Sequence, residues 1–221
     1  MTIKKLLIAN RGEIASRIIS SAHDMGISCV AIYTEADKDT PYVREADQAF
    51  KLSDSYLNSK EILDIALKSN SDAIHPGYGF LSENAAFANQ VKKLNIKWVG
   101  PSSNAIKKMG DKLTAKEIAL KANVPTLPMT SDPKKANSIG YPILVKAAAG
   151  GGGKGMRIVE KAKDLKESIK AAEREAEGGF GDKRVFLERY IKRSRHIEIQ
   201  ILGDAFGNIF HLGERECSIQ R

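Results

Sequence analysis

The sequence predicts an α/β protein with two regions, a parallel α/β layer followed by a region in which helices and antiparallel strands mix. In the first hundred or so residues, short apolar runs alternate with segments of helical apolar spacing, which is typical of a parallel sheet covered by helices. After Gly100 and Pro101 the strand signals instead flank short turns that contain glycine, as in hairpins. We expect the boundary near residue 110, between regions 1–110 and 111–221.

The first region begins with the apolar run at residues 6–9, which is typical of a strand in a buried parallel sheet. Apolar residues at helical spacing then predict a helix over residues 13–25, which Gly26 is expected to end. The other elements expected here are a strand at residues 29–33, a helix at 61–67, a strand at 73–74, a helix that Ser82 caps and that runs to Leu94, and a strand at 98–99.

The second region opens with a predicted helix over residues 112–122, because Asp111 is of a residue type that caps helix N-termini. The elements expected after it are a loop at residues 125–133, strands at 143–146 and 156–159, a charged helix at 162–175 that the glycines of 178–181 end, and strands at 185–190, 196–202 and 208–212. No closing helix follows the last strand signal, so we expect a truncated piece of a longer protein.

Composition and charge disfavour several classes of function. The net charge is +8, but the basic residues are scattered and no aromatic platform accompanies them, which argues against a nucleic-acid groove. Cys29 and Cys217 make neither a disulfide framework nor a metal-ligand spacing, and no apolar run approaches the length of a membrane span. We expect a cytoplasmic protein with no nucleic-acid or membrane partner, and a few lysines that bind phosphate.

A glycine run at residues 150–153 and 155 is the sharpest local feature. Consecutive glycines lack Cβ atoms, so backbone N–H groups can converge on an anion. Because a strand follows the run, it does not fit a dinucleotide fingerprint, which opens a helix. The P-loop pattern also fails, because Gly155 stands where Ser or Thr should be and Ala148 where the first Gly should be. A flap over nucleotide phosphates is the favoured interpretation, and a flexible hairpin tip is the alternative. Lys146 ends the entering strand and is expected to reach phosphate oxygens, although strand-end lysines are commonly just solvated.

The strand at residues 196–202 alternates strictly. Its isoleucines share one face, which we expect to pack, while His196, Glu198 and Gln200 share the other. That polar face either contacts a ligand or is exposed to solvent. The preceding segment, residues 188–191, offers extended backbone that could hydrogen-bond an adenine edge.

Six segments together resemble biotin carboxylase, the ATP-dependent ATP-grasp component of acetyl-CoA, propionyl-CoA, methylcrotonyl-CoA and pyruvate carboxylases. In the family's order, they are residues 8–15, 75–84, 109–112, 146–156, 195–200 and 214–221. One segment would be modest evidence, whereas six in register are specific. The resemblance implies a Rossmann-like amino-terminal domain at residues 1–110 and the first part of an ATP-grasp domain at 111–221, with a glycine-rich flap at about 125–190.

The resemblance also implies a binding site. Its ATP-binding residues would be Lys112 and Lys146 at the phosphates, Gly152 and Gly153 in the flap, Glu188, Arg189, Tyr190 and Ile191 around adenine, and His196 beside the ribose. Two positions depart from the family, since Arg189 replaces a common lysine and Ala148 a frequent serine. Arg189 should be tolerated if backbone groups contact adenine. Residues 10–13 and 75–84 are left as architecture or as substrate-side candidates.

The family's reaction implies cofactors and partners. ATP phosphorylates bicarbonate, magnesium neutralises the phosphates, and the carboxyl group passes to biotin. We therefore expect ATP, Mg2+ and biotin as cofactors, with a biotin carboxyl carrier protein or domain, a carboxyltransferase, bicarbonate and a second copy of the completed chain as partners. The family's metal ligands and catalytic residues would lie beyond residue 221, so none is assigned, and we expect this chain alone to be inactive.

Three alternatives stay open. A carbamoyl-phosphate synthetase half shares the flap and the lysines, but residues 75–84 argue against it. A nicotinamide dehydrogenase is disfavoured because the first strand-to-helix turn, residues 9–13, lacks the glycine fingerprint. A non-catalytic nucleotide-binding module is the third. The sequence does not indicate which acyl-CoA or keto acid a complete enzyme would serve.

Overall fold

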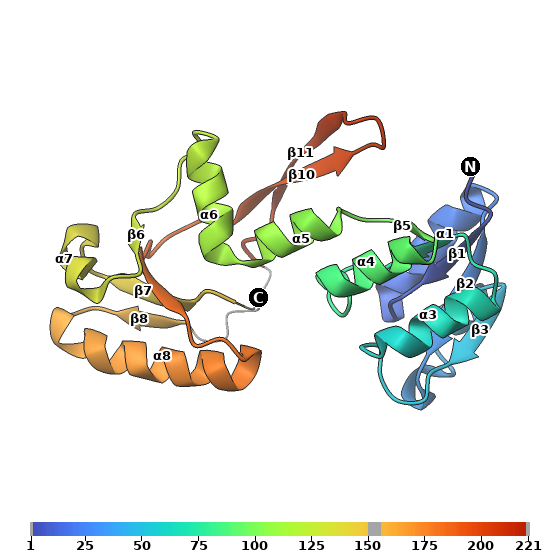
Figure 1. Cartoon of the computed structure of the whole chain (residues 1–221), viewed down its shortest axis with the longest axis horizontal. Coiled ribbons are helices and arrows are strands. Elements are labelled where there is room, and N and C mark those ends of the chain that lie inside the picture. The colour runs from blue at the N-terminus through green and yellow to red at the C-terminus, as the bar shows by residue number, and fades with distance from the viewer. Residues whose placement is uncertain (1, 150–155, 220–221) are drawn as a thin grey trace. The chain divides into compact units, whose positions relative to one another are not determined.

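The chain folds into two compact units, residues 1–107 and 108–221 (Figure 1). The computed structural model describes residues 2–149 and 156–219. Each unit has its own sheet and its own apolar core. Among the described residues, no helix combines the length and the apolar character that a membrane-spanning segment requires.

The first unit contains a five-stranded sheet of order β3-β2-β1-β4-β5, in which all neighbours are parallel. Its strands are β1 (Lys5–Ile8), β2 (Ser28–Tyr33), β3 (Gln48–Lys51), β4 (Ala73–His75) and β5 (Lys97–Trp98). Its helices are α1 (Gly12–Asp24), η1 (Glu35–Asp37), α2 (Pro41–Glu45), α3 (Ser59–Lys68) and α4 (Ala85–Lys93). The parallel α/β layer predicted from the sequence is confirmed.

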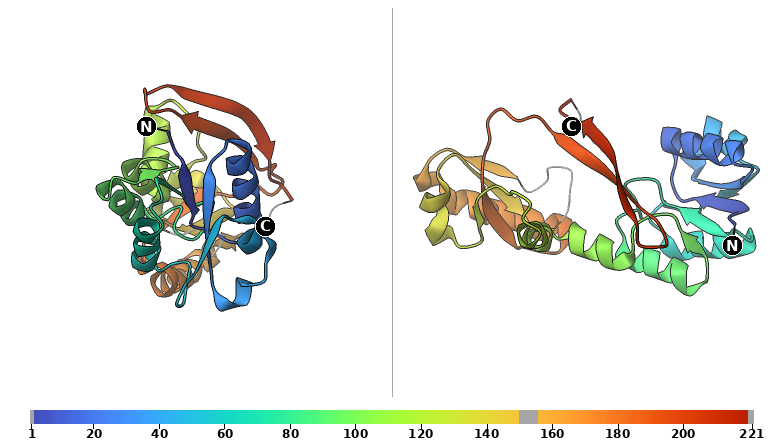
Figure 2. Two further views of the ribbon diagram at one scale, coloured as in Figure 1. Left: turned by 90° about the vertical axis from the view of Figure 1, so that its right-hand side faces the viewer. Right: turned by 90° about the horizontal axis from the view of Figure 1, so that it is seen from above.

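Helices cover both faces of this sheet (Figure 2). Leu7 of β1 packs in one apolar cluster with residues of α3 and α4, whereas its neighbours Leu6 and Ile8 pack in a second cluster with residues of α1 and α2. Successive side chains of a strand point to opposite faces, so both faces of β1 are buried. This is why the strand has a continuous apolar run in the sequence and not an alternating one.

The second unit contains a four-stranded antiparallel sheet of order β6-β9-β7-β8 and a two-stranded antiparallel hairpin, β10-β11. The strands are β6 (Met129–Thr130), β7 (Ile143–Ala147), β8 (Arg157–Val159), β9 (Val185–Arg189), β10 (Ile197–Gly203) and β11 (Ile209–Glu216). The helices are α5 (Ser103–Gly110), which runs across the division between the units, α6 (Lys112–Lys121), η2 (Pro133–Lys135), α7 (Ala136–Ile139), η3 (Ala162–Asp164) and α8 (Leu165–Phe180). The antiparallel α+β character predicted for this region is confirmed.

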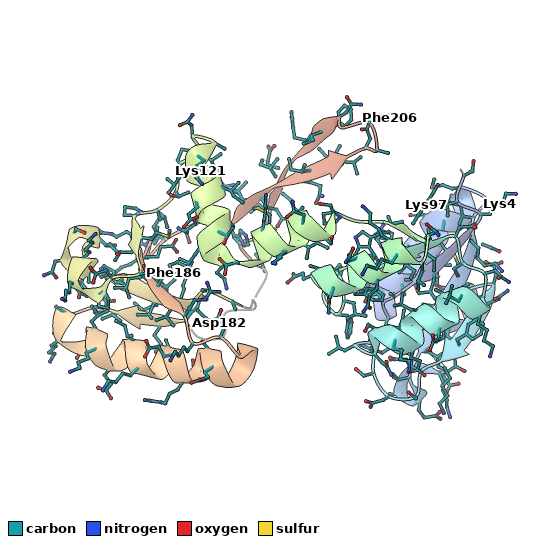
Figure 3. All side chains as sticks on the ribbon, in the orientation of Figure 1. Lys4, Lys97, Lys121, Asp182, Phe186 and Phe206 are labelled. Atoms are coloured by element: carbon teal, nitrogen blue, oxygen red, sulfur yellow. The ribbon has the colours of Figure 1, made fainter. Side chains whose placement is uncertain are left out.

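Two helices of the second unit differ in how they are held. Leu165 and Ala172 of α8 are buried against Val145 and Leu187 of the sheet, so α8 covers one sheet face with an apolar interface. In contrast, α6 has no buried residue anywhere along its length. Lys121 marks the last residue of α6 in Figure 3.

The β10-β11 hairpin leaves its apolar side chains exposed (Figure 3). Ile197, Ile199 and Ile201 are 44%, 55% and 53% exposed, and Phe206 at the turn is 91% exposed. The expectation that these isoleucines form a packed face is therefore wrong for the described part of the chain. The pairing with β11 is also irregular between Ile199 and Ile201, where a β-bulge breaks the strict alternation that the sequence suggests.

Other differences from the predicted elements have local causes. Asn84 caps α4 in place of Ser82, because its Oδ1 accepts a hydrogen bond from the backbone N of Phe87 at 2.9 Å. Helix α8 continues through Gly178 and Gly179 and ends at Gly181, the last glycine of the predicted stop, whose φ of +67° is left-handed. The expected loop at 125–133 contains β6, and β3, α2 and α5 were not predicted.

Candidate functional site

A cluster of lysines and one glutamate occupies the sheet face opposite α8. Side chains of β7 alternate between two faces, and since Val145 packs in the core against α8, Lys146 points to the other face. Glu188 of β9 shares that face, because it pairs with Leu144, two residues before Lys146. Helix α6 adds two lysines. The lysine cluster consists of Lys112, Lys116, Lys146 and Glu188.

Glu188 is the centre of the lysine cluster. Its side chain is 4% exposed, and its two oxygens accept from different lysines, Oε1 from Lys116 Nζ and Oε2 from Lys146 Nζ, the second at 2.5 Å. Burial by itself raises the pKa of the Glu188 carboxyl, but the hydrogen bonds from both lysines lower it below its ordinary value. Glu188 is therefore an ionised carboxylate that holds two cations at one buried point.

Lys112 lies where the end of β7 meets the start of α6. Asp111 caps the helix through its side chain, as the sequence predicts. The Nζ atom of Lys112 donates to the carbonyls of Ala147 and Ala149 at 3.3 and 3.4 Å. The Lys112 ammonium is thereby held at the stretch of chain that leads directly into the glycine run at residues 150–155.

The predicted adenine segment, residues 188–191, forms the end of β9 and the chain after it. The Arg189 side chain lies on the sheet face opposite the lysine cluster, where its Nη1 donates to the carbonyl of Ile139 at 3.1 Å. Tyr190 is partly buried and Ile191 is 45% exposed. Only backbone groups of Arg189 can contribute to a site on the cluster's face.

His196 lies on the hairpin. Its side chain is exposed, its backbone N donates to Ser218 Oγ at 3.0 Å, and its carbonyl accepts from the backbone N of Cys217 at 2.7 Å. The hairpin and the four-stranded sheet that carries the lysine cluster are separate sheets. Gly152 and Gly153 lie outside the described residues.

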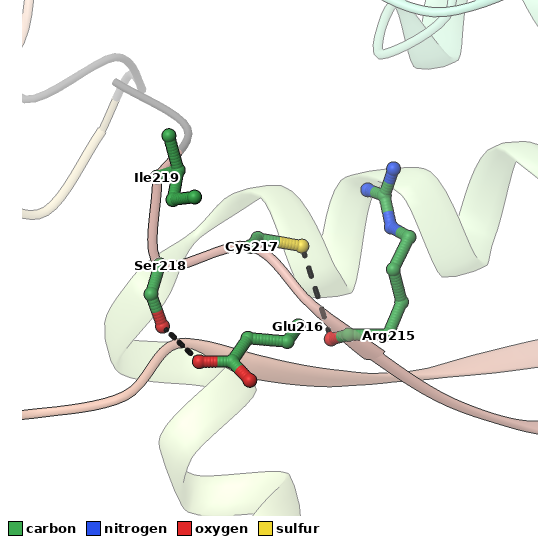
Figure 4. A pocket seen from close by; sticks show the side chains of 5 residues that line it. All are labelled: Arg215, Glu216, Cys217, Ser218 and Ile219. Carbon is green, nitrogen blue, oxygen red and sulfur yellow. Dashed lines mark hydrogen bonds between the residues drawn. The ribbon is translucent and has the colours of Figure 1, made fainter.

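A depression of about 460 Å³ at the end of the hairpin is lined by residues 215–219 (Figure 4). The acid in it is already paired, since Glu216 accepts from Ser218 Oγ at 2.8 Å and forms an ion pair with Arg195 at 2.6 Å. None of the predicted ATP-binding residues lines it. The candidate site is therefore the lysine cluster.

In the first unit, the two segments that received no role meet at the carboxyl ends of β1 and β4. Asn10 is 2% exposed, and its Nδ2 donates to the carbonyls of Pro76 at 2.7 Å and Tyr78 at 2.8 Å. Gly77 has a φ of +62°, and a Cβ there would lie 2.6 Å from Asn10 Nδ2. Asn10 and Gly77 thus fix the loop after β4, which is an architectural role.

Arg11, the residue after Asn10, connects this part of the first unit to η1. It forms an ion pair with Asp37, whose side chain is 4% exposed, and its Nε donates to Asp37 Oδ2 at 2.7 Å. The Tyr56 hydroxyl donates to the same oxygen at 2.5 Å. The hydrogen bond from Arg11 is the main reason that the pKa of the Asp37 carboxyl is lowered.

Lys116 is the member of the cluster that sequence reasoning missed. It follows Lys112 by four residues on a helix that the sequence predicts, and this spacing places two side chains on the same helix face. Because Lys112 was expected at phosphates, the spacing alone indicated Lys116 as its neighbour.

The chain has a parallel α/β unit followed by an antiparallel sheet. One face of that sheet carries lysines, and its strand β7 precedes a glycine run in the sequence. This arrangement defines the ATP-grasp class. Two family profiles match the chain, that of the biotin carboxylase N-terminal domain at residues 2–106 and that of the carbamoyl-phosphate synthase L chain ATP binding domain at residues 103–221. The chain belongs to the biotin carboxylase family and corresponds to the amino-terminal part of its members.

Relatives of known sequence and structure agree with this assignment. Biotin carboxylase 1 of Bacillus subtilis is 50% identical, over 99% of this chain and 52% of that protein, and the chloroplastic biotin carboxylase 2 of Populus trichocarpa is 45% identical, over 99% and 44%. A biotin carboxylase complex with β,γ-ATP from Campylobacter jejuni has a TM-score of 0.95 and 47% identity, over all of this chain and 52% of that one. The chain thus spans about half the length of these relatives.

Proposed function

We propose that the protein carrying this chain is a biotin carboxylase, an ATP-dependent ligase that uses bicarbonate to carboxylate biotin on a carrier protein. The observation that carries the proposal is the lysine cluster at the stretch of chain that precedes the glycine run, in a chain of this family. The Hydrogenobacter thermophilus 2-oxoglutarate carboxylase domain, 45% identical with a TM-score of 0.95, was solved with MgADP, ADP and bicarbonate. We extend nucleotide and bicarbonate binding from that protein to this one.

The charges of the cluster fit a nucleotide. Around Glu188, two ammonium groups face one carboxylate that is nearly inaccessible to water, which gives a net charge of +1. Buried like charges are unfavourable without a counter-ion, so an anion beside the cluster stabilises it. Phosphate oxygens are acceptors for ammonium donors and form strong, charge-assisted hydrogen bonds with them.

The proposed ATP site consists of Lys112, Lys146, Gly152, Gly153, Glu188, Arg189, Tyr190, Ile191 and His196. In this proposal Lys112 and Lys146 hold and orient the phosphates, and backbone groups of residues 188–191 contact adenine. The domains that we propose are a pre-ATP-grasp domain at residues 1–110 and an ATP-grasp domain from 111, with a flap at about 125–190. Bound magnesium would supply neutralisation of the phosphate charge.

The finer assignments follow from the same family. We propose ATP, Mg2+ and carrier-bound biotin as cofactors and substrate, and an acyl-CoA carboxylase (acetyl- or propionyl-CoA) or a pyruvate carboxylase as the assembly. The partners would be a biotin carboxyl carrier protein or domain, a carboxyltransferase and a second copy of the chain. We place the protein in the cytoplasm, in keeping with its two free cysteines. For the 221 residues alone, about half a relative's length, we propose no carboxylation.

The test is ATP hydrolysis by the full-length protein with and without bicarbonate. We expect phosphate release that depends on bicarbonate and magnesium and that free biotin stimulates. A carbamoyl-phosphate synthetase is the second candidate, because residues 103–221 match the profile named for that enzyme. Formation of a carbamoyl product from ammonia or glutamine would establish that candidate and refute the carboxylase.

A further inference from the structure

We propose that Lys116 is a positioning residue of the nucleotide site. In this role it is the counter-ion that retains Glu188 when Lys146 leaves that carboxylate for a phosphate of the ligand. The inference rests on the proposed function, because it requires an anionic nucleotide beside the lysine cluster. It adds a residue and an exchange of ionic partners to the proposed ATP site.

Without a ligand, Lys146 is engaged by the protein itself. Its Nζ donates to Glu188 Oε2 at 2.5 Å, so a phosphate has to compete with a carboxylate for this ammonium group. Lys116 contacts the other oxygen, Oε1. Because the two lysines use different oxygens, Lys146 can leave while Glu188 keeps one cation.

Burial makes the second cation necessary. The Glu188 side chain is 4% exposed, so water cannot replace a lost partner. Removing one partner of a buried ion pair is strongly unfavourable, because it leaves the other charge unpaired in a medium of low polarity. Without Lys116, the transfer of Lys146 to a phosphate would leave the buried Glu188 carboxylate unpaired. Because this is unfavourable, Glu188 would retain Lys146.

The position of Lys116 favours this indirect role over contact with the phosphates. Lys112 is the first residue of α6, and its Nζ donates to the carbonyls of Ala147 and Ala149, just before the glycine run in the sequence. Lys116 is one helical turn further along, and its Nζ is directed at Glu188. The two lysines of α6 therefore have different roles: Lys112 is directed toward the proposed phosphate side, and Lys116 toward the Glu188 carboxylate.

The test is a double-mutant cycle on the full-length protein, with ATP, inorganic tripolyphosphate and adenosine as probes. Lys116→Met should weaken binding of ATP and tripolyphosphate by about tenfold or more, because Glu188 then retains Lys146, and should change adenosine binding by less than about twofold. In Glu188→Gln no carboxylate holds Lys146, so adding Lys116→Met should change ATP binding by less than about threefold. Lys116→Arg, which keeps the cation, should bind ATP nearly as the wild type does.

Lys121→Met, on the exposed end of the same helix, is the matched control and should bind all three probes as the wild type does. Thermal unfolding of each variant reports folding, and Lys116→Gln replaces Lys116→Met if the latter does not fold. A loss of ATP affinity that persists in the Glu188→Gln background would overturn the role, since Lys116 would then contact the ligand directly. Unchanged affinity, or an equal loss for adenosine, would also overturn it. A wild type that binds neither ATP nor tripolyphosphate refutes the proposed function itself.

Discussion

Replacing Lys146 by glutamine tests the lysine cluster with little change in side-chain shape. The substitution removes one ammonium group, from a side chain that is 24% exposed, and leaves Glu188 paired with Lys116. Because the buried carboxylate keeps a cation, the fold should survive. We expect the free energy of unfolding to fall by about 1.5–3 kcal/mol, the range of a single hydrogen bond to a charged group.

The effect of Lys146→Gln on nucleotide affinity should be larger. An ammonium–phosphate hydrogen bond is charge-assisted and contributes about 1.5–3 kcal/mol, which corresponds to roughly tenfold to over a hundredfold in the dissociation constant of ATP. Isothermal titration of the full-length protein with ATP measures this change. Lys183→Gln is the matched control, because Lys183 is exposed and lies just before β9. Unchanged ATP affinity in Lys146→Gln would show an ordinary strand lysine and refute the site.

Three further predictions concern stability. Asp37→Ala should lower the free energy of unfolding of the first unit by about 2–4 kcal/mol in urea titrations, because it removes the acceptor of a largely buried ion-pair network. Gly77→Ala should lower it by about 1–3 kcal/mol, measured by calorimetry, because the new Cβ meets Asn10 and the φ is positive. Folding lowers the pKa of the Glu188 carboxyl. The stability that Glu188 contributes is therefore present above the ordinary glutamate pKa of about 4.3 and should be lost as the pH falls below it. Glu188→Gln should flatten this part of the profile of stability against pH.

Each of these has a control in the same chain. Asp39→Ala, at an exposed residue two positions from Asp37, should change stability by less than about 0.5 kcal/mol, and a loss equal to that of Asp37→Ala would contradict the network argument. Gly79 also has a positive φ, +65°, but nothing lies within 4 Å of its added Cβ. Gly79→Ala should therefore lower the free energy of unfolding by less than Gly77→Ala does. Equal losses would show that backbone strain, and not the contact with Asn10, causes the effect. Identical acid profiles for wild type and Glu188→Gln would refute the ionised carboxylate.

Most of the regular elements could be predicted, because local signals determine them. The apolar runs of β1 and β2 and the Asp111 cap of α6 are readable from a few consecutive residues. The short elements were missed where the signal is weak. Strand β3 has only two apolar residues among four, and β6 is two residues long, so neither shows a period from which a strand could be inferred.

The site was only partly predictable, for a different reason. Lys146 and Lys112 stand out by their places beside the glycine run and after a helix cap. The pairing of Glu188 with Lys146 depends on the register of β7 against β9, which joins residues about forty positions apart, and on the packing of α6. Such long-range pairing leaves no trace in a local pattern. The sequence indicates Lys116 and Lys146 as residues of the site, but their pairing with the Glu188 carboxylate is visible only in the structure.

The absence of any buried residue in α6 has a consequence for how this helix can move. Among the described contacts, α6 is joined to the sheet by polar groups, through Asp111 to Arg184, Lys112 to two carbonyls, and Lys116 to Glu188. Denaturant sensitivity scales with the surface that an opening exposes. Detachment of α6 uncovers little apolar surface, so hydrogen exchange of its amides should be almost independent of urea at low concentrations. Exchange in α8, whose Leu165, Ala172 and Ala176 are buried, should instead become steeper with urea. The two helices of one unit would then open as separate thermodynamic elements.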